Sequence, residues 1–102
     1  MTVVRWTQGS YEDLAGIWDG IVGKSGSPTL ALNLIDWLID ETGILQENPE
    51  AGARLEESSD PTIRRLVRRD YKIIYKVFEG FVSIRAVVRT VQDVSRLDLN
   101  RP

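Results

Sequence analysis

The chain has 102 residues, of which 42% are hydrophobic and 27% charged, a size and composition typical of one small globular domain with its own core. It contains no cysteine and no histidine, which excludes disulfides, thiolate and imidazole metal sites, and cysteine or histidine catalysis. Any chemistry would have to use carboxylate, lysine, arginine, tyrosine or hydroxyl groups. We therefore expect a single domain over residues 1–102, with no metal site and no cofactor.

The amino terminus lacks the basic segment and apolar run of a secretory signal, and no window approaches 18 uncharged apolar residues. The absence of cysteine fits a reducing compartment. These features favour the cytoplasm, and no membrane partner is expected.

The net charge of −2 conceals an asymmetry along the chain. Residues 1–60 carry three basic and eleven acidic residues, a net charge of −8, whereas residues 61–102 carry ten basic and four acidic residues, a net charge of +6. Two interpretations are open. The second part presents a cationic surface to an anionic partner, or the two parts neutralise each other through surface ion pairs within one fold.

The first part of the chain predicts a strand and a helical hairpin. Residues 2–7 are β-branched and aromatic, which is typical of a strand. Ser10 stands where a helix N-cap is expected, and apolar residues then recur at helical spacing, which predicts a helix over about 11–22. The Ser-Pro pair at 27–28 begins a second helix that runs to about residue 46. Its predicted apolar stripe is Leu30, Leu34, Ile35, Leu38, Thr42 and Leu45.

After a predicted loop over residues 47–62, the hydrophobic period becomes that of strands. The expected strands are Ile63–Arg69, Tyr71–Phe78 and Phe81–Val88. A two-residue turn, Glu79-Gly80, joins the last two, and Val82, Ile84, Ala86 and Val88 are expected on one face. These strands predict a three-stranded antiparallel meander with the N-terminal strand at one side. The fold class is therefore α+β, in the order β-α-α-β-β-β, with the helical hairpin on one sheet face.

Arginines gather in the second part of the chain and form the candidate binding site. Residues two apart share a face of a strand, so Arg64 with Arg68, and Arg65 with Arg69, are predicted to project in pairs. The planar guanidinium suits bidentate recognition of carboxylates and phosphates, which fits an acidic protein segment or a nucleic acid. A solvated sheet face, or pairing with the acidic helices, is the alternative. The candidate residues for binding a partner or target are Arg64, Arg65, Arg68, Arg69, Arg85, Arg89 and Trp37.

Other polar residues are interpreted as structural. Tyr71 and Tyr75 lie beside the arginines, but a tyrosine needs a strong cation field to act as a base, so both are expected to pack within strands. Asp36 and Asp40 share one helix face and are interpreted as solvated rather than as a cation site. No P-loop, nucleophile elbow or Asp-rich metal loop occurs, and no catalytic residue is assigned.

Four pieces of the chain, in this order, resemble a known family. They are Trp6-Thr7 with the helix Asp13-Leu14-x-x-Ile17-Trp18, the turn Asn48-Pro49-Glu50-x-Gly52, the strand Tyr71-Lys-Ile-Ile-Tyr75, and Ser83-Ile-Arg-Ala-Val-Val88 with its tail. Over about residues 3 to 97 the chain resembles a ParE toxin of the RelE/ParE superfamily. These toxins are the toxic half of bacterial toxin–antitoxin (plasmid stabilisation) pairs.

The resemblance implies one of two activities. ParE-like members inhibit DNA gyrase, so that cleaved DNA accumulates. RelE-like members are ribosome-dependent messenger RNA endoribonucleases that use Lys and Arg residues and usually a Tyr or His near the C-terminus. Residues 89–102 contain neither Tyr nor His, and Arg89 stands where much of the family has histidine. A pI of about 5.1 is also unfavourable for entering an RNA-lined cleft. Gyrase inhibition is therefore favoured, with the nuclease as the alternative.

The resemblance also implies a cognate antitoxin whose extended C-terminal part wraps across the toxin in a hetero-oligomer. Apolar residues of the antitoxin are expected on the groove between helices and sheet, and acidic ones against the arginines from Arg64 to Arg69. No sequence-specific DNA binding by this chain itself is expected. A third possibility is a non-toxic member that only regulates together with its partner.

Overall fold

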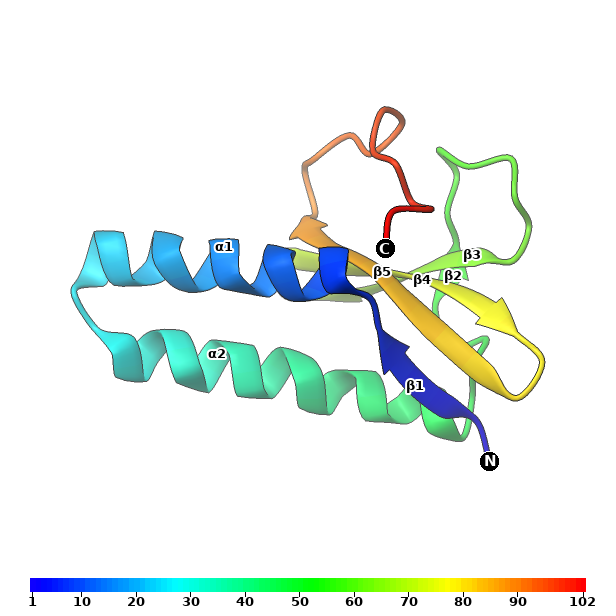
Figure 1. Ribbon diagram of the computed structural model, residues 1–102, viewed down its shortest axis with the longest axis horizontal. Helices are drawn as coiled ribbons and strands as arrows, with labels where there is room; N and C mark the ends of the chain where they lie inside the picture. Colours follow the sequence, from blue (N-terminus) through cyan, green and yellow to red (C-terminus); the bar gives the residue numbers. More distant parts are fainter.

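The computed structural model describes residues 1–102 and confirms the α+β class with the predicted order of elements (Figure 1). Strand β1 (Val3–Trp6) leads into helices α1 (Gln8–Ser25) and α2 (Pro28–Glu41), followed by a short 3-10 helix, η1 (Thr42–Gln46). The remaining strands are β2 (Ala53–Arg54), β3 (Ile63–Arg68), β4 (Tyr71–Phe78) and β5 (Phe81–Arg89). The two helices lie side by side and extend well beyond the sheet. Neither combines the length and the hydropathy that a membrane span requires.

The five strands form one sheet in the order β1-β5-β4-β3-β2. Strands β3, β4 and β5 make the predicted antiparallel meander, and Gly80 in the last turn adopts a φ of 81°, which favours glycine. Strand β1 runs parallel to β5 at its outer edge, with Val3 beside Phe81 and Trp6 beside Ile84. The first strand of the chain is therefore joined to the last one.

Strand β2 lies within the predicted loop over residues 47–62 and pairs only with Arg64 and Arg65 of β3. The chain reaches the sheet edge at Gly52, whose N–H donates to the Tyr75 hydroxyl at 2.9 Å. Only glycine fits this approach, because a Cβ at Gly52 would lie 2.3 Å from the Arg65 carbonyl oxygen. Beyond Arg65 the outer edge of β3 has no strand neighbour.

Helix α1 is one turn longer at its start than the predicted helix over 11–22. Thr7, and not Ser10, is the N-cap, since its Oγ1 accepts the Ser10 N–H at 3.1 Å. The Thr7 hydroxyl also donates to the Ile84 carbonyl of β5 at 2.9 Å. This bond to the sheet fixes the cap immediately after β1, which is why the local signal at Ser10 is wrong.

Helix α2 begins as predicted, with Ser27 accepting the Leu30 N–H at 3.2 Å. The predicted single helix to residue 46 is instead divided between α2 and η1. Leu30 is wrong as a member of the apolar stripe, because it is 55% exposed and Ala31 takes the buried position. The other members of the stripe are buried or half-buried, as expected.

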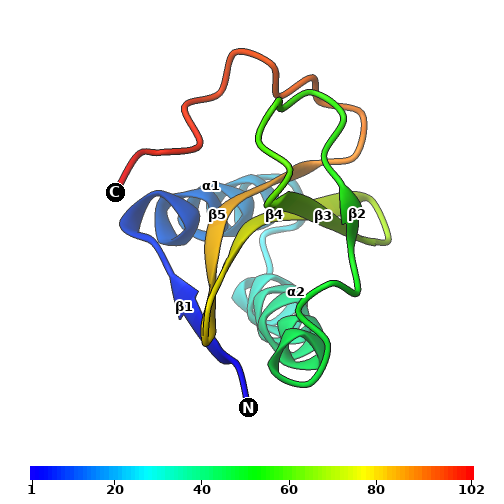
Figure 2. The ribbon, with the colours of Figure 1, turned by 90° about the vertical axis from the view of Figure 1, so that its right-hand side faces the viewer.

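Two apolar clusters lie on opposite faces of the sheet. The helices cover the first, which includes Leu14, Leu38, Leu45, Leu66, Tyr71, Ile73, Tyr75, Val82, Ile84 and Val87. The loop after β2 and the segment after β5 lie over the other face (Figure 2). The second cluster consists of Leu55, Ile63, Ile74, Ala86, Val88 and Val94.

The side-chain alternation of β5 reverses at Arg85. The register of β4 against β5 shifts there, and Arg85 is left without a partner on β4, as in a β-bulge. Ile84 and Val87 therefore belong to the helix-side cluster. Ala86 and Val88 belong to the opposite one. The predicted common face for Ile84, Ala86 and Val88 is wrong because the bulge adds one residue.

Candidate interaction site

Four ion pairs connect the two oppositely charged parts of the chain. Each joins a basic residue in 61–102 to an acidic residue in 1–60. The pairs are Arg68–Glu41, Lys72–Glu57, Lys76–Asp60 and Arg101–Asp13. The two parts therefore neutralise each other in part within the fold. A basic residue whose charge is open to a partner must therefore lie outside these pairs.

Arg64 and Arg68 lie on one face of β3, as predicted, on either side of the core residue Leu66. The Arg64 Nη1 donates to the Gly52 carbonyl at 2.7 Å, and the Arg68 Nε donates to Glu41 Oε1 at 2.7 Å. Both guanidinium groups therefore bind acceptors within the fold. They attach the chain before β2, and helix α2, to the sheet.

Arg65 and Arg69 do not form the predicted pair on one face. Strand β3 ends at Arg68, and Arg69 lies in the turn before β4 with a left-handed φ of 51°. Its guanidinium is directed to α2, with Cζ 4.1 Å from the centre of the Trp37 ring. Trp37 is partly buried against the helix-side cluster and carries Arg69 on its ring. Arg65 stays on β3, half-buried and without an ion pair.

Arg85 and Arg89 both lie on β5 but have different surroundings. Arg85 Nη1 donates to the Leu99 carbonyl at 3.3 Å, and its buried Nε has no acceptor, so this side chain lies beneath the segment after β5. Arg89 is exposed, with Cζ 5.3 Å from the centre of the Tyr71 ring. Tyr71 pairs with Arg89 in the sheet register. Arg89 therefore lies at the end of the sheet where β3 turns into β4.

The structure thus brings four predicted residues to one end of the sheet, and we call this group the cationic end: Arg68, Arg69, Arg89 and Trp37. Of its arginines, only Arg68 has a carboxylate partner. Arg69 and Arg89 each lie over an aromatic ring. A guanidinium stacked in this way keeps the N–H groups at its rim available for an oxygen acceptor.

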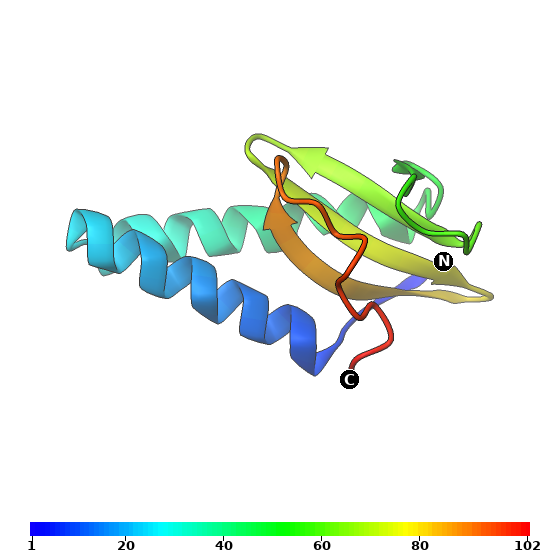
Figure 3. The ribbon, with the colours of Figure 1, turned by 90° about the horizontal axis from the view of Figure 1, so that it is seen from above.

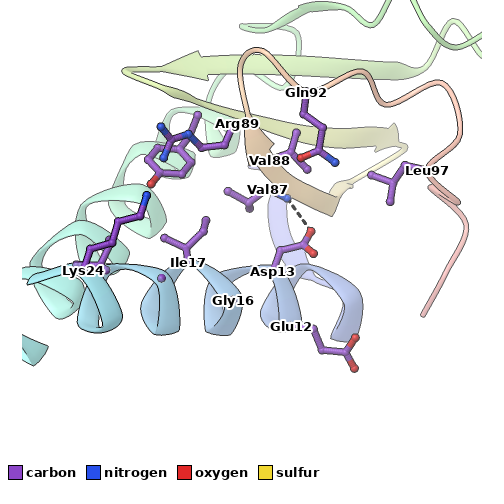
Figure 4. A pocket seen from close by; sticks show the side chains of 13 residues that line it. Glu12, Asp13, Gly16, Ile17, Lys24, Val87, Val88, Arg89, Gln92 and Leu97 are labelled. Atoms are coloured by element: carbon purple, nitrogen blue, oxygen red, sulfur yellow. Dashed lines mark hydrogen bonds between the residues drawn. The ribbon is translucent and has the colours of Figure 1, made fainter. Parts of the chain in front are cut away.

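A groove of about 460 Å³ runs between α1 and β5 beside the cationic end (Figure 4). It forms because β1 pairs only with the first part of β5 before the chain enters α1. On this unpaired side, the Val87 N–H donates to Asp13 Oδ2 at 3.0 Å. Apolar side chains line much of the groove: Ile17, Ile21, Tyr71, Val87, Val88 and Leu97. The basic residues Lys24 and Arg89 also line it.

None of the groove residues of α1 is among the predicted site residues, and three of them form a regular row. Gly16, Gly20 and Lys24 are spaced by four, which places them along one line of the helix. A Cβ at either glycine would meet nothing within 4 Å, so the missing side chains leave the groove open. The spacing can be read from the sequence, but only the position of β5 in the structure shows that these residues line a groove.

The two tyrosines of β4 pack within the fold, as interpreted from the sequence. Tyr75 is fully buried, and burial raises the pKa of its phenol above the usual value, against the opposing effect of the hydrogen bond from Gly52. Tyr71 is 7% exposed. Asp36 and Asp40 are exposed on α2, and no group of three acidic side chains that could hold a metal includes them.

Comparison with known proteins gives a family and a fold. The family model described as "ParE toxin of type II toxin-antitoxin system, parDE" matches residues 4–94. Among solved structures, the chromosomal ParDE toxin–antitoxin system of P. aeruginosa is 26% identical, with a TM-score of 0.73 over 87% of this chain and 96% of that one. The RelBE2 toxin–antitoxin complex of Mycobacterium tuberculosis shares the fold, at 18% identity and a TM-score of 0.60 over 89% and 93% of the two chains. No curated protein matches the chain by sequence.

Proposed function

Since the chain belongs to the ParE toxin family of type II toxin–antitoxin systems, we propose that it inhibits DNA gyrase in the cytoplasm and is neutralised by a cognate antitoxin. The cationic end is the observation that carries this proposal. There, Arg69 and Arg89 have no carboxylate partner, and Arg89 lines a groove with apolar walls. Cations next to an apolar groove suit an anionic, partly apolar segment of a protein partner.

The titratable side chains support binding rather than catalysis. General acid–base catalysis needs a group with a pKa near the operating pH, within hydrogen-bond reach of the reacting atom. The chain has no histidine, and burial moves the pKa of Tyr75 further from neutrality. The Tyr75 hydroxyl is also occupied by the Gly52 N–H.

The antitoxin is expected to form a hetero-oligomer with this chain, as the ParDE and RelBE2 assemblies do by their descriptions. We expect it to be a short acidic protein encoded in the neighbouring reading frame. Its carboxylates would compensate the charges of Arg69 and Arg89, which no carboxylate of this chain pairs with.

A ribosome-dependent messenger RNA endoribonuclease is the second candidate function. The observation that favours it is that Lys24 and Arg89 both line the groove, because lysine and arginine are cations that bind a phosphate. In that function the arginines would stabilise charge developing on the phosphate.

One experiment separates the two functions. The purified chain, freed of antitoxin, is added to a DNA gyrase supercoiling and cleavage assay, and in parallel to a coupled translation reaction. Loss of supercoiling with accumulated broken DNA is the expected result. Intact gyrase activity with cleaved messenger in the translation reaction would contradict the proposal and assign the nuclease.

A matched pair of variants makes the assay specific. Arg89→Ala removes a charge from the cationic end and is expected to weaken gyrase inhibition about tenfold, whereas Arg96→Ala removes an exposed charge outside it and is expected to have no effect. Equal activity of the two variants would exclude Arg89 from the contact with gyrase.

A further inference from the structure

Residues 98–102 fold back against the start of α1 (Figure 2). The Pro102 carbonyl accepts the Gly9 N–H at 2.6 Å. The neighbouring Arg101 Nη2 donates to Asp13 Oδ2 at 2.5 Å, which is one of the four ion pairs of the fold. These two bonds close residues 98–102 onto the first turns of the helix, and we call this segment the latch.

Gly9 makes room for the latch. A Cβ at this position would lie 2.6 Å from the Arg101 Nε, so a larger residue would push the guanidinium away. Gly9 also lies in the first turn of α1, where a backbone N–H has no acceptor within the helix. Its bond to the Pro102 carbonyl therefore satisfies a group that would otherwise need water. The start of α1 is thus shaped to receive the latch.

The latch covers Arg85, one of the arginines predicted from the sequence to bind a partner. The Arg85 Nη1 donates to the Leu99 carbonyl at 3.3 Å, and the Arg85 carbonyl accepts from Arg101 at 3.4 Å. No carboxylate of the chain pairs with Arg85. A backbone carbonyl therefore occupies a guanidinium that would bind a carboxylate more strongly, since hydrogen bonds between charged groups are the strong ones.

The closed latch is held with evident cost. The Nε atoms of Arg85 and Arg101 are buried without an acceptor, and such groups lower the stability of the state that buries them. A cleft of about 340 Å³ lies between residues 94–100 and the loop after β2, so these two segments are not fully packed together. Within the latch, the Asn100 N–H donates to Asp98 Oδ1 at 2.9 Å, a bond that survives when the latch moves as a unit. Segments with these properties open locally before the rest of the fold.

Opening of the latch would complete a surface of aromatic and basic side chains. The Arg85 Cζ lies 5.7 Å from the centre of the Phe78 ring, which stacks on the Phe81 ring with 4.6 Å between their centres. Arg5 is exposed and has no ion pair, and its Cζ lies 4.3 Å from the centre of the Phe81 ring. A freed Arg85 would therefore join a second unpaired guanidinium beside two half-buried rings. This surface suits an acidic segment that also carries an apolar side chain.

We propose that the latch is autoinhibitory. When it is closed, the Leu99 carbonyl occupies Arg85. When it is open, Arg85 and Arg5 bind an acidic, partly apolar segment of gyrase, a target that rests on the proposed function, in addition to the contact at the cationic end. Only the open fraction of the chain is then fully competent, so the concentration needed for inhibition rises by the inverse of that fraction.

The test uses Gly9→Ala and Arg101→Ala, one variant on each side of the latch. Alanine at residue 9 displaces the Arg101 guanidinium, and the second variant deletes it, so both open the latch and keep Arg85. Each variant is expected to inhibit gyrase supercoiling at about a fivefold lower concentration than wild type, as for a latch closed about 80% of the time. Gly23→Ala, in the same helix with nothing within 4 Å of the added Cβ, is the matched control and should inhibit as wild type does.

Two further measurements connect the gain to the latch and to Arg85. The Gly9 amide reports closure directly, because its N–H is bonded to the Pro102 carbonyl. In Arg101→Ala this amide is expected to exchange about tenfold faster by NMR, while the amides in the middle of α1 keep their protection. Adding Arg85→Ala to Gly9→Ala should abolish the gain in inhibition.

Other results would overturn the proposal. Unchanged inhibition by both open variants, with fast exchange of the Gly9 amide, would make the latch a structural contact only. Weaker inhibition by both would mean that residues 98–102 themselves contact gyrase. A gain that persists when Arg85→Ala is added would exclude Arg85 as the covered group. Gyrase that stays active with wild type and both variants alike would instead overturn the proposed function.

Discussion

The two faces of the sheet bury their apolar residues under different kinds of cover. On one face lie α1 and α2, whose backbone hydrogen bonds are formed within the helices. On the other lie residues 55–62 and 90–102, which contain neither helix nor strand, and Figure 3 shows the second of these segments crossing over β5. A cover without regular secondary structure satisfies only some of its backbone groups by local turns, so the others need partners from the sheet below it.

Basic side chains provide those partners. Lys72 is only 6% exposed, and its Nζ donates to the Gln92 carbonyl at 2.7 Å, while Arg85 donates to the Leu99 carbonyl. Lysine is rarely buried unless it is paired in this way. Basic residues on this side therefore hold the chain together, whereas Arg69 and Arg89 at the cationic end remain available to a partner.

The helix-side cover is expected to give the largest loss of stability when broken. Leu38→Ala removes a fully buried side chain from the centre of that cluster, and should lower the free energy of unfolding by about 3 kcal/mol in urea denaturation. Leu32→Ala, on the same helix but 48% exposed, is the control and should change it by less than about 0.5 kcal/mol. Similar losses in the two variants would mean that α2 packs with another face inward.

Disrupting the irregular cover should lower the free energy of unfolding by less than disrupting the helix-side cover. The resulting loss of structure should stay local. Val94→Ala removes part of a side chain that is 2% exposed in the second cluster, with an expected loss of about 1.5 kcal/mol. Hydrogen exchange should then accelerate in residues 90–102 while the helices keep their protection. Val91→Ala, at a position 92% exposed, should leave exchange unchanged. Acceleration throughout the chain would show that both covers unfold together.

The Tyr75–Gly52 hydrogen bond joins the core to the edge of the sheet. Tyr75→Phe should lower the free energy of unfolding at neutral pH by about 1 kcal/mol, because the buried Gly52 N–H loses its acceptor. The raised pKa of Tyr75 means that the unfolded chain ionises first as pH rises, so wild-type stability falls above about pH 10. The phenylalanine variant lacks this effect. The stability difference between the two proteins should therefore narrow above pH 10 in chemical denaturation. A constant difference would contradict the burial of the phenol.

The smallest expected effect is at Asp60, which lies in the irregular cover itself. Hydrogen bonds from the Thr62 side chain and backbone, with Lys76 nearby, lower the pKa of this carboxyl to about 2. Its contribution is therefore present above about pH 4 and is lost as pH falls toward 2. Asp60→Asn should be less stable than wild type at pH 6, with the difference vanishing near pH 2 in thermal unfolding. Asp19→Asn, an exposed carboxyl without a hydrogen bond, is the control.

Local sequence patterns predicted which helices and strands form. Long-range contacts determined where a helix is capped and where the strand alternation changes. The alternation from Tyr71 to Phe78 and the Ser27 cap each act within a few residues, so both were predictable. The cap of α1 depends on Ile84, which is 77 residues from Thr7 along the chain. The bulge at Arg85 has no local signal, since the sequence continues to alternate through it.

The candidate site, too, could be predicted only where local sequence patterns determine it. The concentration of arginines in one part of the chain indicated the strands that reach the cationic end. Which arginines stay free could not be predicted, because Arg68 finds Glu41 from 27 residues away and the turn redirects Arg69 to Trp37. The groove likewise depends on where β1 leaves β5.

The parallel pairing of β1 with β5 also affects when the toxin can fold during its translation. As the chain leaves the ribosome, β1 and the helical hairpin emerge first, but β1 has no strand to pair with until residues 81–84 have been synthesised. Contacts between such distant segments are slow to form, and the sheet beneath the helices is incomplete until then. Translation therefore produces a structured toxin only at its end, which gives an antitoxin already present in the cell time to meet the chain as it folds.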